Sequence, residues 1–139
     1  MVISAAHCGD FSGKYVIVGG YEDGKPTGNA QRVRVAETAL HPGYVDDYND
    51  DDYSVLLLEE AVYLDTDIVV TVNDDDSRPF DGQPVTVLGL GNLSGNPDFD
   101  EYPTYLQDIE VEAIGIDTCN APDAYDDFVD DEKMICAGK

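Results

Sequence analysis

The sequence predicts an all-β protein, built as a sandwich or a barrel. Short runs of apolar and β-branched residues recur along the chain, and turn-forming residues separate them. With 139 residues, of which 42% are hydrophobic, the chain is one globular domain or a piece of a larger one. The expected strands cover residues 14–21, 31–40, 54–58, 83–89, 106–113 and 133–137.

The first informative stretch is the apolar run 2–4, followed by Ala-Ala-His-Cys. An apolar strand that ends on His7 can hold the imidazole at the rim of a barrel. There Nε2 can take a proton from a nucleophile while the Nδ1–H group faces an acid. The alternative is an ordinary core or surface histidine beside a structural cysteine.

Three segments in the middle of the chain justify the expected strands. Residues 32–35 and 108–112 alternate apolar and charged side chains, which is typical of half-buried strands. Residues 55–58 are continuously apolar and predict an interior strand. Turns are expected at residues 23–26, 41–43, 77–82 and 95–97, where Gly, Pro, Asp and Asn gather.

Near the carboxyl end, Asp117 is the expected N-cap of a short helix that runs toward Tyr125, with Pro122 limiting its regularity. Residues 133–137 are the expected last strand. The polar, acidic segment 73–82 is the expected link between a first part, 1–72, and a second part, 83–139.

Asp50, Asp51 and Asp52 stand at the mouth of the apolar strand 54–58. A carboxylate placed against a core needs a partner, because burying a lone charge is costly. In a catalytic arrangement a histidine N–H is a natural partner. The alternative is a solvated acidic loop.

The formal net charge of −23 argues against nucleic acid and anionic membranes as partners. It suits a salty or extracellular medium, where counterions screen the self-repulsion, and it could favour cationic substrates. The sequence lacks an apolar run of membrane-spanning length and a signal peptide, so we expect the true start to lie upstream.

Three cysteines leave one without a partner. Cys119 and Cys136 are close enough in sequence to close a short loop, and Cys8 is left over. The spacing of the cysteines and histidines does not indicate a metal site.

Five blocks, in order, together resemble the trypsin-like, chymotrypsin-fold serine endopeptidases. Residues 2–8 are similar to the family's "TAAHC" block and residues 52–58 to its "DIALL" block. The other three are Gly89-Leu90-Gly91 at the "GWG" position, the "LQ" strand 105–111, and 116–119 with the "M-x-CAG" strand 134–138. Leu90 departs from the usual Trp.

The resemblance implies a double six-stranded antiparallel β-barrel, here without the first strands of barrel 1 and the last strands of barrel 2. It implies that His7 is the general base, that Asp52 orients it, and that Cys119 pairs with Cys136. Asp50 and Asp51 are the rivals, and Asp52 is preferred because it holds the family's position before the strand. No cofactor or metal is implied.

The nucleophilic serine of the family is not expected among the chain's five serines, because no Gly-x-Ser-Gly motif occurs. We therefore expect a fragment of a serine endopeptidase that is inactive alone. The resemblance also implies an extracellular, secreted monomer with protein or peptide substrates and with protein inhibitors as partners.

Two other functions are open. One is a non-catalytic protease homologue that binds proteins. The other is an acidic calcium-binding protein, for which the Asp-rich runs at 46–52 and 74–76, or Glu22 and Asp23, would have to supply ligands. Neither run has the spacing of an EF-hand loop.

Overall fold

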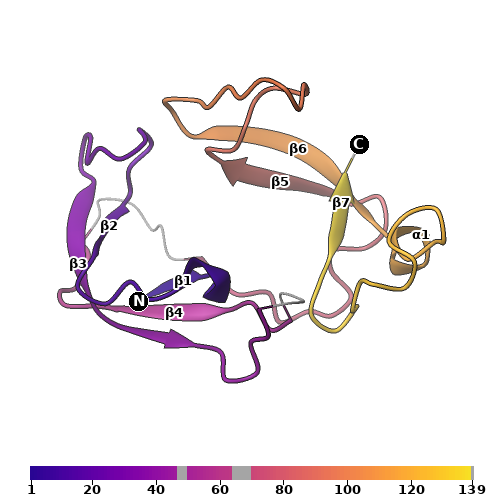
Figure 1. Ribbon diagram of the computed structural model, residues 1–139, viewed down its shortest axis with the longest axis horizontal. Coiled ribbons are helices and arrows are strands. Elements are labelled where there is room, and N and C mark those ends of the chain that lie inside the picture. Colours follow the sequence, from indigo (N-terminus) through magenta and orange to yellow (C-terminus); the bar gives the residue numbers. More distant parts are fainter. Residues whose placement is uncertain (47–49, 64–69, 139) are drawn as a thin grey trace. The chain divides into compact units, whose positions relative to one another are not determined.

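The computed structural model describes residues 1–46, 50–63 and 70–138, and it divides into two compact units, Met1–Ile68 and Val69–Lys139. Each unit contains one antiparallel sheet (Figure 1). The expectation of an all-β protein is confirmed. The division proposed from the sequence, 1–72, 73–82 and 83–139, stays a prediction.

The first unit contains β1 (Val2–Ser4), a 3₁₀ turn η1 (Ala6–Cys8), β2 (Tyr15–Val18), β3 (Gln31–Leu40) and β4 (Ser54–Leu58). Its four strands lie in the order β1-β4-β3-β2 (Figure 1). β4 is therefore an interior strand, as its apolar sequence predicts. Only one of its faces is buried, however: Leu56 is 2% exposed, whereas Leu57 is 52% exposed.

The alternation in β3 builds the core of this unit. Val33 and Val35 point inward and are buried, while Arg32 and Arg34 lie on the exposed face. Arg34 donates a hydrogen bond from Nη1 to Glu59 Oε1 at 2.7 Å, and the Arg32 guanidinium lies 3.6 Å from the centre of the Tyr15 ring. The period of two thus separates core from surface, as predicted.

The second unit contains β5 (Pro84–Gly89), β6 (Gln107–Ile114), the short helix α1 (Ile116–Cys119) and β7 (Cys136–Gly138), with strand order β5-β6-β7. Val85 pairs with Val111 and Val87 with Ile109. The predicted half-burial of 108–112 holds only weakly, because Ile109 is 49% exposed.

β5 begins one residue later than predicted, and β6 is shifted by one residue. Four differences from the predictions are larger. β2 ends at Val18 because Gly19 turns the chain with a φ of 78°. His7 lies in η1, not at the end of β1. β7 begins at Cys136 instead of residue 133, because the Lys133 and Met134 amides donate to the Asp130 carbonyl in a turn.

The helix boundary is the fourth correction. The N-cap of α1 is Gly115, whose carbonyl accepts hydrogen bonds from the Thr118 and Cys119 amides, so Asp117 lies inside the first turn. The Gly115 amide in turn donates to Asp81 Oδ1 at 2.7 Å. The helix ends at Cys119, well before Tyr125.

Candidate active site

The pairing of β1 with β4 brings His7 and Asp52 together. Ser4 lies opposite Ser54 in the antiparallel register. From this pair, the chain continues forward to His7 and backward to Asp52, so both residues leave the sheet at the same end. A separation of 45 residues in sequence becomes a direct contact.

The 3₁₀ turn sets the direction of the His7 side chain. Ala6 is 2% exposed and anchors the turn in the core, and the Gly9 amide closes it with a 2.9 Å hydrogen bond to the Ala6 carbonyl. Gly9 has a φ of 76° and a ψ of −159°. Only glycine adopts that conformation readily, so the turn requires glycine after His-Cys.

Ser54 braces the turn from the opposite strand. Its side chain is almost completely buried, and its hydroxyl donates a 3.0 Å hydrogen bond to the Ala5 carbonyl. A buried hydroxyl must find a partner, and here the partner is the residue that precedes η1. Sequence reasoning missed this role, although a lone serine opening an apolar strand is a visible signal.

His7 and Asp52 contact each other through two hydrogen bonds. His7 Nδ1 lies 2.6 Å from Asp52 Oδ2, and the His7 backbone amide donates to Asp52 Oδ1 at 2.8 Å. A carboxylate carries no hydrogen, so the proton in the first bond belongs to Nδ1. Nε2 is then left with its lone pair and can accept a proton from another group.

The electrostatics keep Asp52 ionised. The hydrogen bond from the His7 side chain, followed by the one from the His7 backbone, lowers the pKa of Asp52 below its ordinary value. The His7 side chain is 56% exposed and that of Asp52 is 22% exposed. The pair is thus an accessible imidazole backed by a more sheltered carboxylate.

The rival residues, Asp50 and Asp51, make other contacts. Asp51 Oδ2 lies 3.8 Å from His41 Nδ1, and the Asp51 carbonyl accepts a hydrogen bond from the Tyr53 amide. The Asp50 carbonyl accepts one from the Val45 amide. These contacts organise the loop that carries Asp52.

Tyr44 is a neighbour of the pair that sequence reasoning did not single out. Its hydroxyl donates to Asp46 Oδ1 at 2.7 Å, and this bond is the main reason that the pKa of Tyr44 rises to about 12. The negative charge of Asp52 adds to the rise. Tyr44 therefore stays neutral at physiological pH, beside the carboxylates of Asp46 and Asp52.

Four of the five serine hydroxyls form hydrogen bonds with groups other than the His7 side chain. Ser54 donates to the Ala5 carbonyl, Ser77 donates to Asp75 Oδ1, and Ser12 Oγ accepts from the Thr38 amide. Ser94 Oγ accepts from the Asn96 amide. Their partners fit structural roles in strands and turns.

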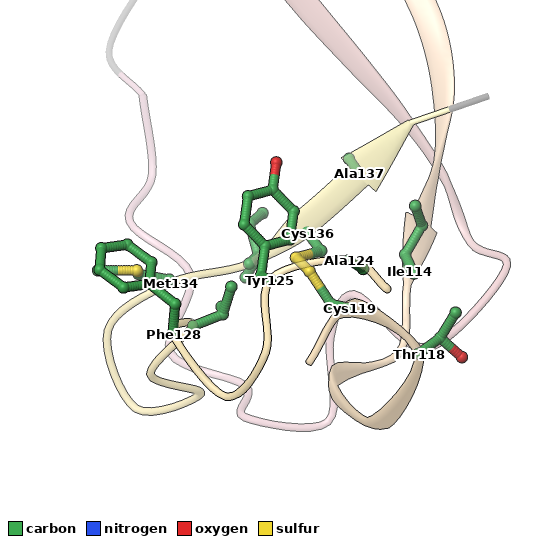
Figure 2. A pocket seen from close by; sticks show the side chains of 11 residues that line it. Ile114, Thr118, Cys119, Ala124, Tyr125, Phe128, Met134, Cys136 and Ala137 are labelled. Atoms are coloured by element: carbon green, nitrogen blue, oxygen red, sulfur yellow. A yellow bond between two sulfur atoms is a disulfide. The ribbon is translucent and has the colours of Figure 1, made fainter. Parts of the chain in front are cut away.

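The second unit contains the other residues that the family resemblance singles out. Cys119 and Cys136 form a disulfide with a Cα–Cα distance of 6.4 Å. The third cysteine, Cys8, lies in the first unit and is exposed and free. The disulfide borders an open pocket of about 540 Å³. Figure 2 shows Tyr125, Phe128 and Met134 around it.

Two carboxylates of the calcium hypothesis, those of Glu22 and Asp75, are engaged by protein groups. Glu22 forms an ion pair with Lys25, and Asp75 accepts hydrogen bonds from the amide and hydroxyl of Ser77. Within residues 1–46, 50–63 and 70–138, no group of three His, Cys, Asp or Glu side chains is arranged to hold a metal ion. Part of the run 46–52 lies outside the described residues.

Among the helices of the described segments, none has the length and apolar character needed to cross a membrane.

Comparison with known proteins finds sequence similarity along the whole chain. Residues 1–139 match the family described as Trypsin. The chain is 30% identical over 139 residues to Transmembrane protease serine 11G of Rattus norvegicus, covering 99% of this chain and 32% of that protein. It is 28% identical over 141 residues to Trypsin of Pleuronectes platessa, covering 99% of this chain and 54% of that protein. The chain thus spans about a third of the length of the first relative and about half of the length of the second.

Proposed function

Since this chain belongs to the trypsin family of serine proteases, we propose that it carries the general base and the orienting carboxylate of a peptide-hydrolysing active site. Its antiparallel sheets are those of an incomplete chymotrypsin-like β-barrel fold. His7 is the proposed base and Asp52 the proposed orienting residue. The 2.6 Å contact between Nδ1 and Oδ2 is the observation that carries the proposal.

The proposed chemistry follows from the tautomer. With Nδ1–H held by Asp52, Nε2 can take the proton of a serine hydroxyl as that oxygen attacks a peptide carbonyl. The imidazolium that forms lies against the Asp52 carboxylate, which stabilises its positive charge. Nε2 then returns the proton to the leaving amine, and water repeats the cycle on the acyl-enzyme.

The nucleophile is proposed to come from outside these 139 residues. The hydrogen bonds that Ser12, Ser54, Ser77 and Ser94 form with other groups support this proposal, as does the part of the relatives that the chain does not span. The chain alone should then be inactive. A longer protein with the serine would be the active endopeptidase.

The proposed setting is extracellular. A secreted monomer with protein or peptide substrates and protein inhibitors fits a trypsin relative, and the net charge of −23 favours cationic over anionic partners.

A fluorophosphonate probe tests the proposal on the natural protein. Such a probe forms a covalent bond only with a serine that an adjacent base activates. We expect one labelled serine in a peptide outside residues 1–139, with labelling lost in His7→Ala. His41→Ala is the matched control, because this second histidine contacts Asp51 instead of Asp52, and it should keep the label.

Two results would contradict the enzymatic proposal. Labelling that survives His7→Ala would remove His7 from the base role. A full-length protein that takes no label would favour the non-catalytic homologue, a protein-binding module that retains the fold.

A further inference from the structure

We propose that Asn92 is an attachment site for an N-linked oligosaccharide. Asn92-Leu93-Ser94 has the acceptor pattern Asn-x-Ser with a residue other than proline in the middle. The chain has six asparagines, and Asn92 alone is followed by Ser or Thr at the second position. The inference rests on the proposed extracellular location and is independent of the roles of His7 and Asp52.

Asn92 lies where an oligosaccharide can be accommodated. It belongs to the long connection between β5 and β6, and its side chain is exposed. A methyl group added at Gly91 or at Gly95 would meet nothing within 4 Å outside the immediate chain neighbours, so open space flanks the acceptor on both sides. Leu93 is also 53% exposed.

The local conformation leaves the acceptor nitrogen with a replaceable hydrogen. Asn92 Oδ1 accepts hydrogen bonds from the Ser94 amide at 2.9 Å and from the Glu101 amide at 3.0 Å. Asn92 Nδ2 donates one hydrogen bond, to Asp100 Oδ1 at 2.7 Å. The amide nitrogen carries two hydrogens, so one can be replaced by a sugar while the other remains available to Asp100.

The donor of the oligosaccharide in this transfer is a sugar linked to a lipid diphosphate. A bond forms between Asn92 Nδ2 and the anomeric carbon of the first sugar, and the bond from that carbon to a polyprenyl diphosphate breaks. The diphosphate leaves with the electron pair, and Nδ2 loses one proton. The folded loop described above is compatible with the product, because Oδ1 keeps both of its hydrogen bonds.

The test is glycopeptide mass spectrometry on the natural, full-length protein, isolated from the medium and from cell extracts. We expect the peptide that contains Asn92 to carry an oligosaccharide. Enzymatic release of the sugar should leave aspartate at that position. An unmodified Asn92 peptide in secreted protein overturns the inference. Protein found only inside the cell and unmodified overturns it together with the extracellular location.

Variants of the full-length protein secreted from a glycosylating host separate the acceptor from its surroundings. Asn92→Gln and Ser94→Ala should both abolish the modification, and Ser94→Thr should retain it. Asn96→Gln is the matched control, because Asn96 is an asparagine of the same loop followed by proline, and it should leave the modification intact. Retention of the sugar in Asn92→Gln overturns the inference. Fluorophosphonate labelling of the same preparations reports separately on the catalytic proposal.

Discussion

The two units of this protein hold their structures by different means. In the first, buried side chains from two strands, β3 and β4, and from η1 form the core, and they are Ala6, Val33, Val35, Ser54 and Leu56. In the second, the buried residues of the described segments are Ala113 and Cys119, and the disulfide ties the end of α1 to β7. Packing supports the His7–Asp52 pair, whereas a covalent bond supports the second unit.

The difference follows from what each unit has to hold. The first holds the side chains of His7 and Asp52 in hydrogen-bonding distance, and close packing fixes such geometry. The second closes a loop with six acidic residues between the two cysteines, at 123, 126, 127, 130, 131 and 132. Like charges so close together repel, and a cross-link limits how far the chain can expand.

The largest expected effect is on catalysis. In the full-length protein, Asp52→Asn should lower kcat for peptide hydrolysis by about 10⁴-fold, because the amide can stabilise the wrong imidazole tautomer and carries no charge to balance the imidazolium. Steady-state kinetics on a peptide amide substrate measures the change.

Asp51→Asn is the matched control for that prediction. Asp51 is adjacent in sequence but lies near His41, so its replacement should change kcat far less. Equal losses in the two variants would contradict the assignment of Asp52.

The second-largest expected effect is a loss of stability that is confined to the second unit. Replacing both Cys119 and Cys136 by serine should lower its free energy of unfolding by about 3 kcal/mol, as expected when a loop of this length is no longer closed. Urea unfolding followed by amide hydrogen exchange would locate the loss.

Cys8→Ser serves as the control, because Cys8 is an exposed free cysteine and its replacement should cost within about 0.5 kcal/mol. If exchange accelerated equally in β3 and β4 of the double variant, the contrast between the two units would be wrong.

A smaller effect is expected where packing braces η1, the turn that carries His7. Ser54→Ala removes the buried hydroxyl that donates to the Ala5 carbonyl. It should lower the stability of the first unit by about 1 kcal/mol. Urea unfolding of wild type and variant checks the value, and Ser77→Ala, at an exposed turn, should have a smaller effect. If Ser54→Ala left the stability of the first unit unchanged, Ser54 would not brace the turn.

The smallest expected effect is on the stability of the protein at low pH. The hydrogen bond from His7 lowers the pKa of Asp52 below 3.8, so the unfolded chain binds this proton more readily than the folded chain. The stabilisation is present above the ordinary pKa and is lost as the pH falls through the lower, folded value. The stability difference between wild type and Asp52→Asn should therefore shrink below about pH 4. A difference independent of pH would contradict the cause assigned to the shift.

The sequence predicts the features that depend on local pattern. β3 and β4 have the predicted bounds. Apolar and charged residues alternate at the start of β3, and β4 is a short continuous apolar run. The resemblance to the family's sequence blocks indicates His7 with Asp52 and Cys119 with Cys136. The structure brings the members of both pairs into contact. Their catalytic roles stay predictions.

Features that depend on distant contacts could not be predicted locally. The η1 turn needs a hydroxyl from Ser54, on another strand, and α1 begins at Gly115 where Asp81 binds its amide. Asp117 is of a residue type that N-cap positions prefer, but it lies two residues after the observed N-cap, Gly115. Tertiary contacts override local propensity at both positions.

The measurement that tests the central claim most directly is ¹⁵N-resolved NMR of the His7 imidazole in the natural protein near neutral pH. The account predicts a proton on Nδ1 and none on Nε2, with the Nδ1 proton shifted far downfield by the short bond to Asp52, and loss of that shift in Asp52→Asn. A proton on Nε2 with Nδ1 bare would contradict the account, because His7 could not then accept a proton from serine.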